Sequence, residues 1–173
     1  MTDAKRSASP APVRYEEVQY FHPAFHCLVL GLAAFLAIAL ISDLVFDHPL
    51  GTKPAPPGML AVLLVLFAFL FFLFFRLTVR VRDACVEAEF GFLGWIRFRV
   101  PLDTVRACEA VTYRPLLEFG GWGIRYGRGG RRCYNARGNR GVLLDTSGGQ
   151  IVIGSQQPDR LAEAIRSAVD RRE

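Results

Sequence analysis

Residues 50–82 read LGTKPAPPGMLAVLLVLFAFLFFLFFRLTVRVR, and this stretch decides the architecture of the chain. After a Pro-rich turn, residues 58–75 form an apolar run without Asp, Glu, Lys or Arg. A helix of about 18 residues spans roughly 27 Å, close to the ~30 Å hydrocarbon core of a bilayer. Arg76 follows at once, and from there apolar and polar residues alternate, which is typical of a strand. The stretch therefore predicts a membrane-embedded helix joined directly to a folded domain.

A second apolar block, residues 24–42, also lacks charged side chains. The chain has 173 residues, 51% of them hydrophobic, and it leaves too little other sequence to bury two such helices in a soluble core. We therefore predict a transmembrane helical hairpin over residues 23–75, with spans at about 24–46 and 58–75. A signal peptide is the competing interpretation of the first block. It is disfavoured because the block begins only at residue 24 and no clear small-residue cleavage site follows.

Basic residues near the span ends predict the orientation of the hairpin. The loop between the spans contains Lys53 alone, next to acidic residues, whereas both outer flanks are basic. The flanking basic residues are Lys5, Arg6 and Arg14 before the first span and Arg76, Arg80 and Arg82 after the second. We therefore expect a multi-pass protein with both termini in the cytoplasm. Residues 1–22, rich in Ser, Ala and Pro, are expected to form a flexible cytoplasmic tail.

Residues 76–173 are predicted to form a cytoplasmic domain of about seven strands closed by one helix. Alternation places Arg80 and Arg82 opposite Glu87 and Glu89 in a first hairpin, where opposite charges stabilise strand pairing. Further strands are expected at 96–100, 105–113 and 122–126. Residues 141–146 and 150–154 form a hairpin across Ser-Gly-Gly, and their apolar character predicts a central position in the sheet. An amphipathic helix is predicted over residues 158–171, with Pro158 in its first turn.

Two segments of this domain carry a resemblance to known proteins. The first contains YRPL at 113–116 and GGWGIR at 120–125; the second contains YN at 134–135, GVLL at 141–144 and IGSQ at 153–156. With the strand order, they resemble uncharacterised bacterial two-span membrane proteins with a cytoplasmic pleckstrin-homology-like (PH-like) domain. The resemblance implies a membrane α plus soluble α+β fold, in which a PH-like small β-barrel or sandwich follows the hairpin, and a place in the bacterial inner membrane. It implies no catalytic residues, because this fold hosts many unrelated roles.

Residues 113–141 differ in composition from everything around them. They are rich in Gly and Arg, with Glu118 as the single acid. They also include the aromatic residues Phe119, Trp122, Tyr126 and Tyr134. Such Gly content predicts positive φ angles or close backbone approach, and Arg forks match phosphate oxygens. We therefore take this Gly/Arg-rich segment as the candidate anion-, lipid- or partner-binding site. Its candidate residues are Arg114, Trp122, Arg125, Arg128, Arg131, Arg132, Tyr134, Arg137 and Arg140.

Several functions remain open for the Gly/Arg-rich segment. The first is binding of a protein partner at the inner membrane surface, as an adaptor, scaffold or accessory subunit, or as a homo-oligomer. The alternative is contact with anionic lipid headgroups of the bilayer. Single-stranded nucleic acid is a weaker candidate, and the segment could also be a purely structural hairpin. The preference for Arg over Lys after residue 53 also fits a GC-rich genome, so the Arg count by itself does not decide.

Catalysis, cofactors and metals are not expected. All three histidines lie at or before residue 48, and the chain has neither a P-loop nor a dinucleotide-binding glycine motif before a helix. His22 with His26, and Asp43 with Asp47, have helical ligand spacing, but polar residues at span ends are usually solvated. The cysteines share no C-x-x-C spacing, so we expect free thiols. These are Cys27, Cys85, Cys108 and Cys133.

Overall fold

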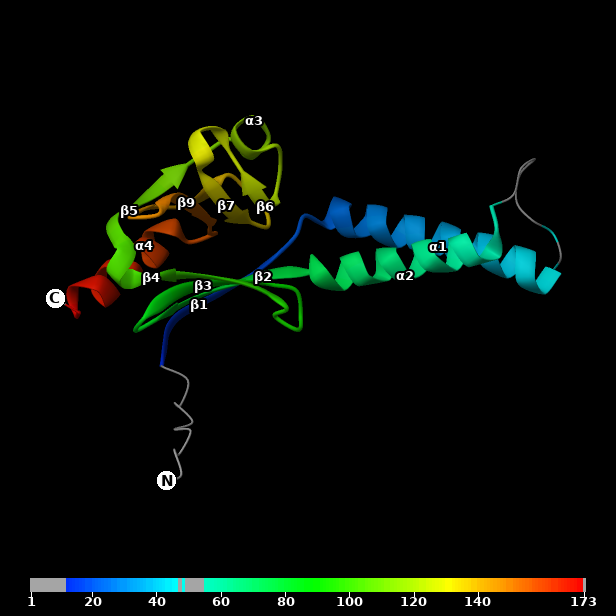
Figure 1. Cartoon of the computed structure of the whole chain (residues 1–173), viewed down its shortest axis with the longest axis horizontal. Coiled ribbons are helices and arrows are strands. Elements are labelled where there is room, and N and C mark those ends of the chain that lie inside the picture. The colour runs from blue at the N-terminus through cyan, green and yellow to red at the C-terminus, as the bar shows by residue number, and fades with distance from the viewer. Residues whose placement is uncertain (1–11, 47, 49–54, 173) are drawn as a thin grey trace, which may run out of the picture.

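The computed structural model describes residues 12–46, 48 and 55–172. They form a pair of helices that projects from one end of a domain built of two β-sheets and shorter helices (Figure 1). The two long helices, α1 (Pro23–Phe46) and α2 (Pro57–Leu73), lie side by side. Only Phe74 and Phe75 separate α2 from β2 (Arg76–Arg82), so the predicted direct connection between helix and domain is confirmed. The predicted loop around Lys53 falls outside the described residues.

The first sheet has four antiparallel strands in the order β1-β2-β3-β4. Besides β2, its strands are β1 (Val13–Tyr20), β3 (Cys85–Phe90) and β4 (Ile96–Pro101). The expected flexible tail over residues 1–22 is therefore wrong for residues 13–20, which pair with β2 from Val13 opposite Arg82 to Tyr20 opposite Arg76. Residues 1–11 fall outside the described part of the chain. The chain thus enters the sheet before the first helix and returns to it after the second.

The second sheet has five strands in the order β5-β8-β9-β7-β6. They are β5 (Val105–Thr112), β6 (Gly123–Tyr126), β7 (Arg132–Asn135), β8 (Arg140–Thr146) and β9 (Gly149–Gly154). The predicted β8–β9 hairpin is present and central. β7 pairs in parallel with β9 and was not expected, so the described strands exceed the predicted seven. Short helical turns connect the strands: η1 (Leu102–Thr104), α3 (Pro115–Phe119) and η2 (Arg128–Gly130).

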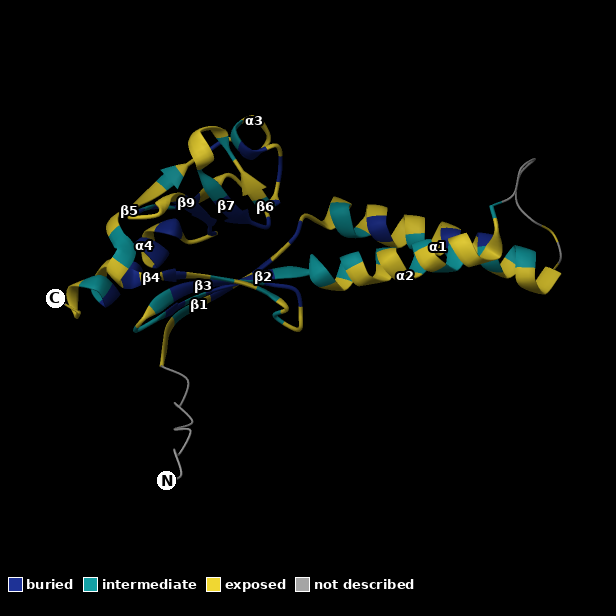
Figure 2. Ribbon diagram, in the orientation of Figure 1, coloured by how far each residue is buried: buried dark blue, intermediate teal, exposed yellow. Residues whose placement is uncertain are grey.

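Helix α4 (Pro158–Asp170) ends the described domain, where the amphipathic helix was predicted. Pro158 occupies its first turn with Asp159 beside it, and Leu161 and Ile165 on its apolar face are completely buried. They join the inward residues of both sheets, such as Phe90 and Leu144, in one core. Figure 2 shows this buried layer between the sheets and α4. The domain is therefore an α+β fold with one main core.

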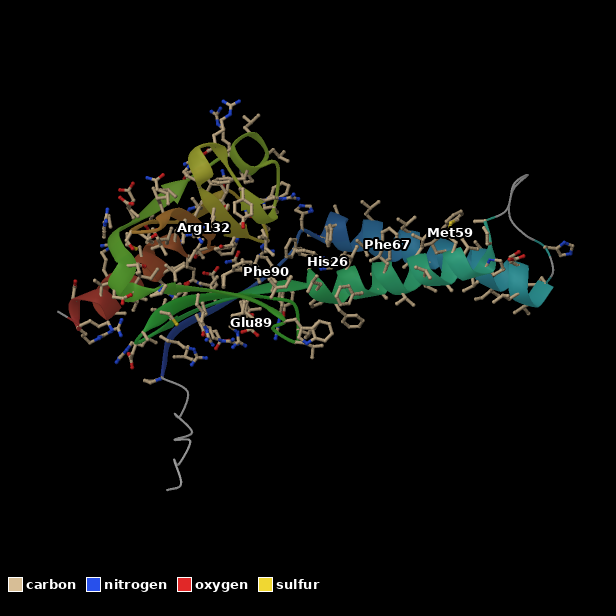
Figure 3. All side chains as sticks on the ribbon, in the orientation of Figure 1. His26, Met59, Phe67, Glu89, Phe90 and Arg132 are labelled. Atoms are coloured by element: carbon tan, nitrogen blue, oxygen red, sulfur yellow. The ribbon has the colours of Figure 1, made fainter. Side chains whose placement is uncertain are left out.

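The outward face of the first sheet carries a network of ion pairs. Arg80 contacts Glu89 at 2.7 Å and Glu16 at 3.0 Å, and Arg82 contacts Glu87 at 2.8 Å. Arg80 lies directly opposite Glu87 in the strand register, as the alternation predicted. Figure 3 shows Glu89 and Phe90, neighbours on β3, pointing to opposite faces of the sheet. These arginines therefore serve strand pairing.

β1 is held to the second sheet through polar side chains on its buried face. Glu17, 8% exposed, accepts hydrogen bonds from the Tyr15 hydroxyl at 2.8 Å, the Ser155 hydroxyl at 2.6 Å and the backbone N–H of Gln156 at 2.6 Å. Gln19, fully buried, donates from Nε2 to a backbone carbonyl at the end of β9 at 2.7 Å. These bonds tie the segment before α1 to the segment before α4, and we call Glu17 with its three donors the Glu17 clamp.

The helix pair leaves most of its apolar surface uncovered by the rest of the chain. α1 is long and apolar enough to cross a membrane, and α2 is a shorter apolar helix of 17 residues. No residue of α2 is buried, and large side chains such as Leu28 and Val65 are more than two-thirds exposed, at 70% and 69%. Figure 2 shows this exposed surface along both helices.

Candidate functional site

The Gly/Arg-rich segment folds as a run of short elements at the edge of the second sheet: α3, β6, η2 and β7, followed by the turn into β8. The predicted positive φ angles are present at Gly120, Gly121, Gly123, Gly129, Gly130 and Gly138. These turns reverse the chain several times within few residues. As a consequence, the candidate side chains point to different parts of the surface and do not form one cluster.

Two candidates, Trp122 and Arg125, reach the base of the helix pair. With Phe21, His22 and Phe25 around the start of α1, and Phe74 just after α2, they line an open cavity of about 290 Å³. This is the point at which α1 leaves the domain. The structure therefore brings an indole and a guanidinium next to the first turn of α1, the helix long and apolar enough to cross a membrane.

The positions of Trp122 and Arg125 are fixed by backbone hydrogen bonds. The indole Nε1 of Trp122 donates to the carbonyl of Gly138 at 2.9 Å, and Arg125 Nε donates to the carbonyl of Trp122 at 2.9 Å. The terminal guanidinium nitrogens of Arg125 have no hydrogen-bond partner among the described residues. His22 accepts at Nδ1 from the backbone N–H of Ala24 at 3.2 Å, which leaves its Nε2 for another partner. The cavity thus combines aromatic walls with the terminal N–H groups of Arg125 and with Nε2 of His22, which are available to a ligand.

Arg131 and Arg132 have partners within the domain. Arg131 contacts Glu118 at 2.9 Å and lies 5.4 Å above the centre of the Phe119 ring. The pKa of Glu118 lies below its ordinary value because the backbone N–H of Arg114 donates to it, with a further contribution from Arg131. Arg132 makes a long contact of 3.4 Å to the carbonyl of Gly148. Figure 3 shows Arg132 in the part of the domain away from the helix pair, far from His26 at its base.

Tyr134 is 3% exposed and belongs to the core. Its ring stacks on Phe98 of β4 with a centroid distance of 4.3 Å, which joins the two sheets. It therefore contributes no surface for a partner in this structure.

The remaining candidates are exposed and separate from the cavity. Arg140 at the start of β8 contacts Asp159 at 3.4 Å. Arg114, Arg128 and Arg137 are exposed, and no side-chain hydrogen bond or ion pair of theirs occurs among the described residues. Of the nine predicted residues, only Trp122 and Arg125 line the cavity at the helix base.

Sequence reasoning missed the partners that α1 supplies to this cavity. His22 was considered as a metal ligand, but neither it nor Phe21 was linked to the Gly/Arg-rich segment about 100 residues later. The available signal was the aromatic run around Pro23, FHPAF at 21–25, immediately before an apolar block. No group of three or more His, Cys, Asp or Glu side chains with metal-binding geometry occurs within residues 12–46, 48 and 55–172.

Comparison with known proteins adds no assignment. A scan of the sequence against protein-family models finds no match, and a search among curated proteins finds no significant one.

Proposed function

We propose that this protein is a non-catalytic, two-span protein of the bacterial inner membrane whose PH-like cytoplasmic domain binds anionic lipid headgroups at the helix base. The support for the two-span topology is the pairing of β1 with β2. β1 leads into α1 and β2 follows α2, so both ends of the helix pair belong to one sheet and lie on one side of any membrane that the pair enters. This pairing favours two crossings over a single one.

The surface of the helices supports their insertion. A helix that is apolar on all sides needs either a protein core or lipid around it. The rest of the chain does not provide the core, because the side chains of α2 are all at least partly exposed. α1, with 24 residues, is long enough for the hydrocarbon region, and α2 reaches a similar length when Phe74 and Phe75 are included.

The basic flanks support a cytoplasmic domain. Arg14, Arg76, Arg80 and Arg82 lie in the paired strands at the domain side of the helices, and basic residues are retained on the cytoplasmic side. A PH-like arrangement is supported by two largely antiparallel sheets packed around one core, with a helix after the last strand.

The observation that carries the headgroup proposal is the shared cavity of Trp122, Arg125, His22 and Phe25. With α1 in the bilayer, this cavity lies at the level where Trp side chains and phosphate groups are enriched. Arg125 directs unpaired donors there, and a planar guanidinium matches phosphate oxygens. A basic residue near an anionic surface contributes about 1 kcal/mol, which is about a fivefold change in lipid affinity.

The test is the lipid preference of the full-length protein in nanodiscs of mixed phosphatidylcholine and phosphatidylglycerol, measured by native mass spectrometry. Arg125→Gln should reduce the enrichment of bound phosphatidylglycerol about fivefold. Arg128→Gln removes the same charge from an exposed position of the same segment, outside the cavity, and should leave the enrichment unchanged. Equal losses in both variants, or no loss in either, would contradict a site at the helix base.

A protein partner is the second candidate, and a different surface favours it. Leu116 and Leu117 on α3 are 65% and 76% exposed, and Tyr126 at the end of β6 is 71% exposed. β6 is an edge strand of the second sheet, with backbone groups open to pairing. If this surface binds a protein, a polypeptide should co-purify at fixed stoichiometry from host membranes, and Leu117→Glu should release it. Retention of the polypeptide by that variant would place the interface elsewhere.

A further inference from the structure

The turn between β3 and β4, residues 91–95, packs against the end of α2 that joins the domain. An apolar, partly open cavity of about 140 Å³ is lined by Phe69, Phe72 and Leu73 of α2 and by Phe92, Leu93 and Trp95 of the turn. In Figure 1 this turn lies below the start of the helix pair, next to α2, whereas β6 lies on the side of α1, level with its first turns. The cavity is therefore separate from the one formed by Trp122 and Arg125.

Two glycines fix the shape of the turn. Gly91 has a φ of +80°, and its N–H donates to the carbonyl of Arg76 at 2.8 Å. A Cβ at this position would lie 2.9 Å from the carbonyl oxygens of Phe72 and Leu73, so only glycine lets the turn lie directly on the end of α2. At Gly94, with φ of +61°, a Cβ would collide with the carboxylate of Glu89.

Glu89 is itself held in place, because it contacts Arg80 at 2.7 Å and Arg97 at 3.3 Å. The turn is thus anchored to α2 at one end and to the outer ion pairs of the sheet at the other.

This fixed turn presents large apolar side chains outward. Leu93 is 68% exposed and Trp95 is 65% exposed. The Trp95 ring lies 5.9 Å from that of Phe69 in α2, and Phe92 stacks on Phe75 at 4.7 Å. The exposed surface of the turn is therefore continuous with the apolar surface of α2. The backbone of the turn holds these apolar side chains outward. Exposing them to water is unfavourable unless another apolar group covers them.

We infer that the turn enters the bilayer beside α2 and that its cavity holds part of the acyl chain of a membrane phospholipid. The inference depends on the insertion of α1 and α2 that is part of the proposed function, but not on headgroup binding by Arg125. The cavity volume of about 140 Å³ is close to the ~150 Å³ of an engineered apolar cavity that takes up benzene. That volume suits a stretch of one chain and is too small for a protein helix, whose diameter is about 10 Å.

A charged group lies at the edge where a phosphate would be. The guanidinium of Arg76 lies 4.9 Å from the centre of the Phe92 ring, and its buried Nε has no hydrogen-bond partner among the described residues. Lipid whose chain enters the cavity would place its phosphate near this level, since Arg76 marks the end of the apolar run. Trp95 packs on Phe69, about two helical turns before Arg76, where its ring would lie beside the acyl chain. Chain, phosphate and indole therefore point to one lipid molecule between α2 and the turn.

The two tryptophans of the chain allow a direct test, because each serves as the control for the other. Trp122→Phe leaves Trp95 as the sole indole, and Trp95→Phe leaves Trp122. Each full-length variant is reconstituted in phosphatidylcholine vesicles that contain a lipid brominated at carbons 6 and 7 of one chain, and tryptophan fluorescence is recorded. We expect quenching of Trp95 to be at least twofold stronger than quenching of Trp122, with Trp95 emission shifted to the blue.

Two outcomes would overturn the inference. Red-shifted, unquenched Trp95 emission would show that the turn lies in water. Blue-shifted emission that the brominated chain does not quench would show that protein covers the turn, and dependence on protein density would identify a second copy. The vesicles are neutral, so Trp95 quenching does not depend on anionic lipid. The two tests can therefore fail separately: Arg125→Gln can leave the phosphatidylglycerol preference unchanged while Trp95 is quenched, and it can reduce that preference while Trp95 is not quenched.

Discussion

Replacement of Glu17 by alanine should destabilise the domain strongly, although Glu17 lies in a strand with a polar sequence. The carboxylate accepts bonds from Tyr15, Ser155 and the backbone of Gln156, at 2.8, 2.6 and 2.6 Å. Hydrogen bonds to a charged group contribute about 1.5 kcal/mol each at the lower end, or ~4.5 kcal/mol for three. Water reaching the freed donors recovers part of this, so we expect a net loss of about 3 kcal/mol.

The neighbouring Glu16→Ala is the matched control. Glu16 points to the outer face, where its side chain is 45% exposed and pairs with Arg80 at 3.0 Å. An exposed pair of this kind contributes at most about 1 kcal/mol. For a chain of this size 1 kcal/mol corresponds to about 2–4 °C in Tm, so Glu17→Ala should lower Tm by about 6–12 °C and Glu16→Ala by no more than about 4 °C.

The assay is thermal unfolding of the full-length protein in mild detergent, followed by intrinsic fluorescence. If the two variants shift Tm equally, the Glu17 clamp does not hold β1, and the reasoning that both helix bases are fixed in one sheet loses its energetic basis.

Two further predictions concern titration and thiol chemistry. Burial alone would raise the pKa of Glu87, but hydrogen bonds and charges from Arg82 and Arg99 outweigh it and lower the pKa. This carboxylate therefore contributes stability above its unfolded pKa of about 4.3, and that stability is lost as the pH falls through the lower folded pKa. Glu87→Gln should have a lower free energy of unfolding than wild type at pH 7, and the difference should shrink below about pH 4. A difference in urea unfolding that stays constant across this range would contradict the assignment. Burial raises the pKa of Cys133 to about 12, so a charged maleimide at pH 8 should label it only on unfolding. Cys27 on α1 is exposed in the structure, but in intact vesicles it should resist the same reagent because lipid covers it; rapid labelling located there by peptide mass spectrometry would exclude insertion of that part of α1.

Strands whose buried face is apolar could be predicted from the sequence. In β3, Val86, Ala88 and Phe90 alternate with charged partners, and all three are buried as the pattern indicated. The central hairpin of β8 and β9 and the amphipathic α4 are recognisable for the same reason. In each case one local pattern of side chains determines both the element and the face it buries.

β1 lacks that pattern, because its buried face is polar. It turns Glu17 and Gln19 inward and leaves Val18 and Tyr20 on the outside, the reverse of what burial of apolar surface predicts. Its pairing depends on hydrogen bonds to Ser155 and Gln156, which lie far along the chain. β7 was missed for a related reason: its parallel pairing with β9 is a non-local contact that no short segment encodes.

The candidate site shows the same limit. Composition drew attention to the Gly/Arg-rich segment, and several of its glycines adopt the positive φ angles that were predicted. Composition could not show which side chains share a surface. Trp122 and Arg125 meet the start of α1 only because β1 returns that start to the domain, and Tyr134 enters the core because β7 lies inside the sheet.

The geometry of the helix base explains why both cavities occur there. Neighbouring strands lie about 4.8 Å apart, whereas packed helices keep their axes 8–10 Å apart. β1 and β2 are paired neighbours, yet they continue into α1 and α2, so the chain must spread at residues 21–22 and 74–75. Aromatic rings fill the wedge: Phe21 packs on Phe74 at 5.9 Å, and Tyr20 packs on Phe75 at 5.5 Å.

On either side of this wedge, one part of the domain lies against the base of a helix. The segment with Trp122 and Arg125 lies beside the start of α1, and the β3–β4 turn lies beside the end of α2. If a membrane surrounds the helix pair, its surface therefore contacts both of these parts of the domain. In the proposed arrangement, the first part presents Arg125 to headgroups and the second presents Leu93 and Trp95 to acyl chains. Both parts lie at the place where the chain steps from strand spacing to helix spacing.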